Sequence, residues 1–327
     1  MTRFIALSLF WFVALCGSAW GQGFPDRAIT LVVPFAASGP MDVLSRTLAV
    51  ALGKYLKQPV IIENIAGAGG TVGAAYVARA VPDGYTVLVY HVGMATTPSL
   101  YRNLPYEPLR DFELVGEVAD VPMTLVARND LPAGNLKELL AHLKAHPGRV
   151  RLAHAGAGSG SHLCGLLLEG TAGVDVQKVV YKGTGLAMGD LLAGKVDLMC
   201  DLTTTATPQI LAGKIKSYGV TTPQRLPILP RLPTLREAGL GVEVAMWHGL
   251  YLPRGTPKPV VDKLAEALHV ALQDPGLKEL FKELGTEPVP LARATPASLR
   301  RHLEGEMDRW SKIIKGAGEF ASLDPAQ

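Results

Sequence analysis

The sequence predicts a two-lobed α/β protein in which each lobe is a parallel sheet covered by helices. Two separate stretches, 28–90 and 136–221, alternate short apolar runs with helical patterns, and such βα alternation favours a parallel sheet with helices on both faces. Small-residue loops follow several of the strands. Two extended segments, near 112–128 and 244–252, join the stretches. Two lobes connected by two extended crossings form a clamshell with a cleft between them.

The first lobe begins with a buried parallel strand and a helix that has one apolar face. The predicted elements are a strand at 28–33, a helix at 40–57, a strand at 58–63, a helix at 71–80 and a strand at 85–90. Residues 91–97 then form a loop. Two extended runs, 112–118 and 122–128, cross to the second lobe.

The second lobe repeats the alternation before the chain returns. Helices are predicted at 136–146, 163–168, 185–193 and 205–212, with strands at 150–153, 177–181, 196–200 and 217–221. An extended run at 244–252 is the return crossing, and helices at 259–273, 276–284 and 296–316 complete the chain. We therefore assign residues 22–120 plus 247–327 to lobe 1 and residues 121–246 to lobe 2.

Composition excludes some classes of function. The 327 residues are 48% hydrophobic, which is ample for a sizeable core, and carry a formal net charge of +3. That charge is small, and Lys and Arg are scattered without interleaved aromatic residues, so we expect no nucleic-acid partner. No metal-ligand spacing such as H-E-x-x-H occurs, and we expect no metal and no cofactor.

The N-terminus predicts a secretory signal peptide, residues 1–21, and hence a periplasmic protein. A positive start is followed by an apolar run at 4–15 and by small residues, with cleavage after Ala19 or Gly21. A membrane anchor is the alternative, but the run is shorter than the ~20 residues of a membrane span. Cys16 allows lipidation, although Leu15 stands where a small residue is expected.

Cleavage leaves two cysteines, Cys164 and Cys200. In an oxidising compartment an isolated pair is a candidate disulfide, and both residues are predicted near one edge of lobe 2. We expect a disulfide here rather than two buried thiols.

A small-residue loop at 154–163 lies between a strand and a helix. Its glycines allow a ligand to approach the backbone, and the first turn of the helix offers unpaired N–H groups and partial positive charge. Ser159 or Ser161 is placed to cap the helix. Such a loop suits a carboxylate or phosphate; the alternative is an ordinary connection without a ligand.

A second loop of the same design, at 35–42, follows the first strand. Ligands of open parallel sheets bind outside the carboxyl ends of the strands. Five segments here occupy such ends and are expected to face one cleft: 35–42, 91–97, 154–162, 181–185 and 201–205. The candidate ligand-binding residues are Phe35, Ala36, Ser38, Gly39, Met41, Asp42, His91, Thr96, Gly156, Gly158, Ser159, Gly160, Ser161, His162, Tyr181, Asp201 and Thr203.

Several short blocks, in their order along the chain, carry a family resemblance. They are FPDR at 24–27, PFA at 34–36, SGPMD at 38–42, PDGY at 82–85, GSGSHL at 158–163, YKG at 181–183, LPTLREAG at 232–239 and PRGTP at 253–257. Over nearly the whole mature chain, the sequence resembles the periplasmic solute receptors of tripartite tricarboxylate transporters, the Bug family.

This resemblance implies a type II periplasmic-binding-protein fold with two Rossmann-like lobes and a small carboxylate between them. It implies that the loops 35–42 and 156–162 hold the carboxylate through backbone groups and bridging waters, and that membrane components of such a transporter are the partner of a monomeric receptor. The chain departs from the family at Ser38 and Met41, and its segment 201–205 offers hydroxyls where many members are more apolar.

Individual residues have alternative roles. Asp42 either orients the first loop, accepts from an ammonium group or sits on the helix dipole. His162 either donates to a carboxylate or caps and packs. Tyr181 is a wall or a donor. Asp201 selects an amino group on the ligand or organises the threonines that follow it.

Parts of the sequence suggest three functions other than a transport receptor for carboxylates. The glycines at 67–73 suggest a dinucleotide site, but Val72 stands where the third glycine belongs. A secreted serine hydrolase would use Ser159 or Ser161 with a histidine, yet no G-x-S-x-G elbow is intact. A receptor that presents its ligand to a sensor protein remains an alternative to a transport receptor.

Overall fold

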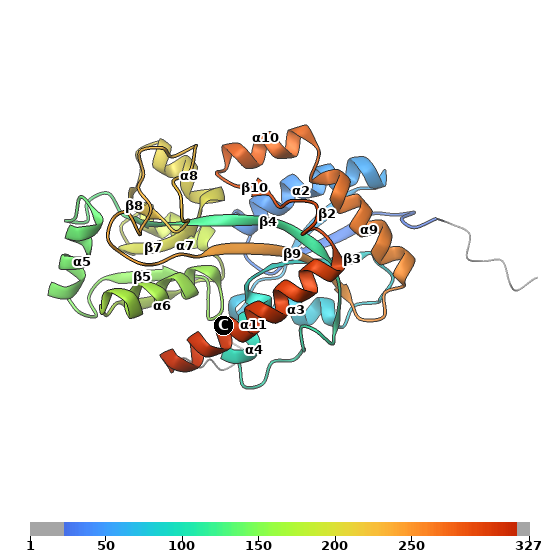
Figure 1. Ribbon diagram of the computed structural model, residues 1–327, viewed down its shortest axis with the longest axis horizontal. Helices are drawn as coiled ribbons and strands as arrows, with labels where there is room; N and C mark the ends of the chain where they lie inside the picture. Colours follow the sequence, from blue (N-terminus) through green and yellow to red (C-terminus); the bar gives the residue numbers. More distant parts are fainter. Residues whose placement is uncertain (1–22, 319–327) are drawn as a thin grey trace, which may run out of the picture.

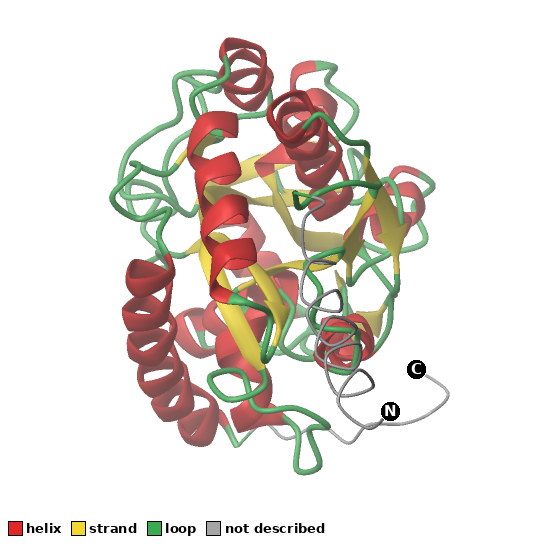
Figure 2. Ribbon diagram, turned by 90° about the vertical axis from the view of Figure 1, so that its right-hand side faces the viewer, coloured by secondary structure: helices red, strands yellow, loops and turns green. Residues whose placement is uncertain are grey.

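The structure is a computed structural model that describes residues 23–318, so the predicted signal peptide lies outside the described residues. Two α/β halves lie side by side, and the long strands β4 and β9 run through both of them (Figure 1). Helices cover the strands on several sides (Figure 2). The predicted fold class is confirmed.

The first half is built on three parallel strands in the order β2-β1-β3. β1 and β3 are largely buried because their connections are helices that pack on the sheet, whereas β2 is the edge strand and is partly exposed. Its elements are β1 (Ile29–Val33), α2 (Pro40–Leu56), β2 (Val60–Asn64), η1 (Ala68–Gly70), α3 (Thr71–Ala78), β3 (Thr86–His91) and α4 (Gly93–Leu100).

One antiparallel pair connects the halves. β4 (Phe112–Ala127) and β9 (Ala245–Pro253) pair from Phe112↔Pro253 to Pro122↔Ala245, with two irregularities in register. The two extended runs predicted at 112–118 and 122–128 are therefore one strand. Both predicted lobe boundaries, after residue 120 and after residue 246, lie inside these strands, and the lobe assignment stays a proposal.

The second half places β4 beside β7 and β8, β7 beside β5, and β5 beside β6. Here the far end of β4 is antiparallel to β7 and β8, whereas β5, β6 and β7 run parallel. The elements are α5 (Leu136–Ala145), β5 (Arg151–His154), α6 (Gly160–Ala172), β6 (Gln177–Val180), α7 (Thr184–Leu192), β7 (Leu198–Leu202), α8 (Thr203–Leu211) and β8 (Lys216–Val220).

The C-terminal region returns to the first half, where α9 and α10 pack on α2, and α11 packs on α4 and β4. These elements are α9 (Lys258–Ala271), α10 (Pro275–Glu283), β10 (Glu287–Pro288) and α11 (Pro296–Ala317). Trp247 is buried at the start of β9, and its indole N–H donates to Glu306 of α11 at 3.3 Å.

The prediction of a loop at 91–97 is wrong, because α4 occupies most of this segment. Thr96, Thr97 and Pro98 are poor helix formers, so the local sequence gave little sign of a helix. Packing against α11 supplies the missing stabilisation, and the Thr97 hydroxyl donates to the Gly93 carbonyl at 2.9 Å. The two-residue strand β10 was also not predicted.

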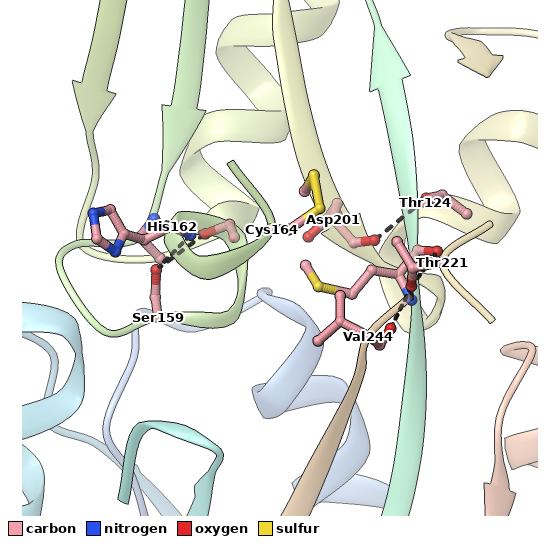
Figure 3. Close-up of a disulfide and its surroundings, with 11 residues drawn as sticks. Thr124, Ser159, His162, Cys164, Asp201, Thr221 and Val244 are labelled. Atoms are coloured by element: carbon pink, nitrogen blue, oxygen red, sulfur yellow. Dashed lines mark hydrogen bonds between the residues drawn. A yellow bond between two sulfur atoms is a disulfide. The ribbon is translucent and has the colours of Figure 1, made fainter. Parts of the chain in front are cut away.

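The predicted disulfide is confirmed. Cys164 of α6 and Cys200 of β7 are bonded, their Cα atoms are 6.1 Å apart, and both are almost fully buried. The bond ties the first turns of α6 to the end of β7 within the second half (Figure 3).

Two buried histidines lie where the halves are joined. His91 of β3 is directly opposite His248 of β9, and their ring centroids are 6.0 Å apart. Burial lowers the pKa of His91 to about 3 and that of His248 to about 4. Both rings are therefore neutral in the folded protein at any pH near neutrality.

Removing the disulfide will lower the free energy of unfolding. The bonded residues are 36 apart in sequence, and closing a loop of this size in the unfolded chain stabilises the fold by about 2–4 kcal/mol. Urea unfolding of the double variant Cys164→Ala, Cys200→Ala should show this loss. A reducing agent should reproduce it in the wild type and leave the double variant unchanged; equal midpoints for both proteins would contradict the prediction.

Acid will destabilise the protein through these histidines. The unfolded chain takes up their protons below about pH 6.5, while the folded chain does so only near pH 3–4, so stability falls as the pH falls through that window. The buried Asp201 carboxyl, whose pKa is raised to about 6, acts in the opposite direction between about pH 4 and 6. A comparison between variants is therefore needed.

We expect His248→Phe to lose less stability than the wild type between pH 6.5 and 4.5, as measured by urea unfolding at each pH. His146→Gln, at an exposed position after α5, is the matched control and should follow the wild type. Identical slopes for His248→Phe and the wild type would refute the assignment.

Candidate functional site

A small cavity of about 30 Å³ lies between the halves, with room for about two water molecules. Its wall combines both halves, and the first half contributes Phe35, Gly39, Pro40, Met41 and His91, while most other residues come from the second. The lining residues are Phe35, Gly39, Pro40, Met41, His91, Met123, Ala155, Ser159, Gly160, Ser161, Thr184, Cys200, Asp201 and Leu202.

Four helices begin at this cavity. α2 starts at Pro40, α6 at Gly160, α7 at Thr184, and α8 directly after Leu202. A helix N-terminus presents unpaired N–H groups and a partial positive charge. No Lys or Arg side chain contributes to the described cavity wall. The attraction for an anion therefore comes from the backbone, as the sequence predicted for two of these helices.

The first loop is held by Asp42. Its carboxylate accepts from the Ser38 N–H and Arg46 at 2.9 Å and from Asn64 at 3.0 Å. Burial alone would raise the pKa of Asp42, but these hydrogen bonds lower it below its usual value. Asp42 does not line the cavity. Of its alternative roles, the structure supports orienting the loop, in which Ser38 has a left-handed φ of 64°.

The second loop is held by its own side chains. The N–H groups of Gly156 and Gly158 donate to the Nδ1 atoms of His154 and His162, at 3.2 and 3.4 Å. The Ala155 N–H donates to the Ser161 hydroxyl at 2.9 Å. Because these bonds occupy N–H groups of the loop, they fix its shape and leave the start of α6 as the part that faces the cavity.

Ser159 caps α6. The sequence predicted either Ser159 or Ser161 as the cap. The Ser159 hydroxyl accepts from the His162 N–H at 3.3 Å and lies 3.1 Å from the Ser161 hydroxyl (Figure 3). Burial, with His154 nearby, lowers the pKa of His162 to about 3, so this ring is neutral. His162 packs behind the loop rather than on the cavity wall.

Glycines of the second loop permit the halves to touch. A Cβ atom at Gly156 would lie 2.7 Å from the Gly69 nitrogen, and Gly158 has a left-handed φ of 81°. The Gly158 carbonyl accepts from the Thr96 hydroxyl at 3.2 Å. The stretch 67–73, which resembled a dinucleotide loop, thus approaches the other half of the protein.

Further hydrogen bonds hold the halves together around the cavity. The Tyr101 hydroxyl donates to the Ala157 carbonyl at 3.0 Å, and the Thr204 hydroxyl donates to the Pro40 carbonyl at 3.3 Å. The Ala36 N–H donates to the Lys182 carbonyl at 3.1 Å, which places Ala36 in this contact rather than at the cavity. The structure is therefore a closed arrangement.

Asp201 is fully buried at the end of β7, on the cavity wall. Burial raises the pKa of this carboxyl to about 6, opposed in part by the nearby hydroxyls of Thr205 and Thr184. The Thr205 hydroxyl donates to Oδ2 at 2.5 Å. The other oxygen, Oδ1, has no hydrogen-bond partner among the described residues, and neither does the Thr184 hydroxyl.

The predicted site residues divide into two groups. Those on the cavity wall are Phe35, Gly39, Met41, His91, Ser159, Gly160, Ser161 and Asp201. Those that lie off the wall are Ala36, Ser38, Asp42, Thr96, Gly156, Gly158, His162, Tyr181 and Thr203. The Tyr181 hydroxyl donates to Asp190 at 2.9 Å, and that of Thr203 to the Gly285 carbonyl at 3.0 Å.

Sequence reasoning missed six wall residues: Pro40, Met123, Ala155, Thr184, Cys200 and Leu202. Five of them lie within or beside segments that were predicted to face the cleft, so the signal was their position at a strand end. Met123 lies in the middle of β4, and nothing in its local sequence indicates a site.

Within residues 23–318, no group of three or more His, Cys, Asp or Glu side chains is placed to hold a metal ion. In the same range, no helix has the length and apolar content to span a bilayer.

Known proteins share this architecture. The structure of the periplasmic binding protein BugD has a TM-score of 0.88 and 48% identity to this chain, covering 90% of it and 99% of BugD. The structure of MatC from Rhodopseudomonas palustris with bound malate has a TM-score of 0.86 and 39% identity, covering 89% of this chain and all of MatC.

Sequence comparison agrees with the structural one. The UPF0065 protein in the TAR-I ttuE-ttuC′ intergenic region of Agrobacterium vitis is 44% identical over 319 residues, which is 97% of this chain and 92% of that protein. The model of the family described as "Tripartite tricarboxylate transporter family receptor", TctC, matches residues 44–318. The chain therefore belongs to the tripartite tricarboxylate transporter receptor family, as a Bug-type solute-binding protein.

Proposed function

We propose that the protein is exported to the periplasm, where it captures a small carboxylate between its halves and delivers it to the membrane components of a tripartite tricarboxylate transporter. The observation that carries this proposal is the convergence of four helix N-termini on a cavity whose described wall has no Lys or Arg. Malate, bound by the related MatC, is a ligand of this chemical class.

Capture works by closure of the halves. A cavity of about 30 Å³ is too small to hold a dicarboxylate, so the halves must lie further apart than in this structure both when the ligand enters and when they close on it. The direct hydrogen bonds between the halves contribute to the closed state, and the ligand adds to it only the free energy of contacts that it makes with both halves, here with the starts of α2 and α6. Bridging waters extend this contact at little cost in free energy. The lobes that move are the two assigned from the sequence, with their boundaries after residues 120 and 246, within one monomer.

We propose no catalytic role for the serines of the second loop. The Ser159 hydroxyl caps α6, and the Ser161 hydroxyl accepts from the Ala155 N–H, so both serve the shape of the loop. No observation favours delivery to a sensor protein over delivery to a transporter.

A ligand screen tests the proposal. Carboxylates that bind will raise the melting temperature, because a ligand at a hundred times its Kd stabilises the folded state by about 2.7 kcal/mol. We expect a shift with a subset of di- and tricarboxylates or amino acids, and none with the corresponding amides. The screen is repeated after unfolding and refolding, which removes a ligand that copurifies. No shift with any acid after refolding would refute the proposal.

Thr184→Val tests the placement of the site. Thr184 lies on the cavity wall beside Asp201, and its hydroxyl has no hydrogen-bond partner among the described residues. Loss of a hydrogen bond to the ligand, direct or through water, should weaken affinity about five- to tenfold by calorimetry. Thr222→Val, at the surface after β8, is the control and should bind as the wild type does. Equal affinities of Thr184→Val and Thr222→Val would show that the ligand does not bind at this cavity.

A further inference from the structure

Asp201 is the ionisable group of the cavity wall that the carboxylate site leaves unexplained. The other titratable side chain on the described wall is His91, which is neutral, and Cys200 is in the disulfide. Asp201 is fully buried, yet its Oδ1 has no hydrogen-bond partner within residues 23–318. A buried polar oxygen without a partner is costly, so its placement on a cavity wall indicates a donor on the ligand.

The surroundings of Asp201 supply hydroxyls but no cation. Thr205 of α8 donates to Oδ2, Thr184 of α7 lies nearby, and Thr124 of β4 donates to the backbone carbonyl of Asp201 at 3.3 Å (Figure 3). The Leu202 backbone also lowers the pKa of this carboxyl, and no charged side chain of the described part of the chain lies close enough to shift it. On the first turn of α6 the titratable side chain is His162, which is neutral because burial lowers its pKa to about 3.

The charge of Asp201 therefore needs compensation. Burial raises the pKa of its carboxyl to about 6, so at neutral pH the group is mostly ionised. A buried charge is stable only when it is paired and hydrogen-bonded. The partial positive charge at the start of α8 offsets a part of it.

We propose that Asp201 is the specificity-determining residue of the site, with Oδ1 accepting a hydrogen bond from an ammonium group on the ligand. This inference rests on the proposed function and narrows it: the preferred ligand is a carboxylate that also carries a protonated amine, as amino acids do. The ligand carboxylate lies at the helix N-termini and its ammonium at Asp201, so each charge meets its opposite.

Other occupants fit less well. A hydroxyl would satisfy the hydrogen bond but leave the charge of Asp201 uncompensated. A dicarboxylate without an amine would add a negative charge beside it and force Asp201 to take up a proton. These alternatives predict different orders of affinity and different responses to pH.

The test compares ligands that differ only in the group beside the carboxylate. Affinities for aspartate, malate and succinate, and for alanine, lactate and propionate, are measured by calorimetry at pH 7.5 on refolded protein. We expect the amino acid to bind at least about tenfold more tightly than its two analogues in one of these series, as a charged hydrogen bond predicts. Hydroxy acids or unsubstituted acids that bind as tightly or more tightly would overturn the inference.

Substitution of Asp201 and the pH dependence of binding test whether Asp201 causes the preference for the amino acid. Asp201→Asn should abolish the preference for the amine, and the matched change Asp262→Asn on the exposed face of α9 should retain it. In the wild type, affinity for the amino acid should fall from pH 7.5 to 5, because protonation of Asp201 removes the acceptor charge. Affinity that rises instead would mean that protonated Asp201 is the donor, which contradicts the inference.

Two controls separate the possible failures. Circular dichroism and the melting temperature of ligand-free Asp201→Asn show whether it folds; if it does not, the pH dependence of the wild type decides. Binding of malate or succinate but of no amino acid would overturn the inference and leave the proposed function standing. Binding of no carboxylate in any series would overturn both.

Discussion

The antiparallel pairing of β4 with β9 is the interaction on which the rest of the structure depends. Both strands cross from one half to the other. The register of their pairing therefore positions the helix N-termini of one half relative to those of the other half. Side chains reinforce the pair. Arg293 binds Glu117 and Asp120 of β4, and Trp247 of β9 binds Glu306 of α11. The cavity forms where these strands hold the two sets of strand ends against each other.

The cavity wall attracts anions through helix N-termini, with no Lys or Arg among its described residues. Helix N-termini attract an anion through N–H groups that keep a fixed direction and carry no competing counter-ion. A wall of this kind suits many carboxylates, because the backbone does not distinguish the chain attached to the carboxyl group. Asp201 and the hydroxyls around it are the features of this wall that differ from a general anion site.

Sequence reasoning predicted the architecture well because the βα alternation and the loops after strands are local patterns. It placed Ser159, Gly160 and Asp201 on the wall from their positions at strand ends. It also expected Gly156 and Gly158 there, but these glycines serve the close approach of the halves, and a local pattern cannot distinguish a ligand from another segment of the chain. α4 was missed because tertiary packing overrides the weak propensity of its threonines.

The hydrogen bonds that close the halves have a consequence for the kinetics of exchange. In the proposed capture cycle, the halves separate only after hydrogen bonds such as those from Tyr101 to Ala157 and from Thr204 to Pro40 have broken. The residence time of a captured ligand is then governed by the rate at which the two halves separate, and this rate limits the release of every ligand. Substitutions at these contacts would change how fast the protein loads and unloads while leaving its chemical preference as it is.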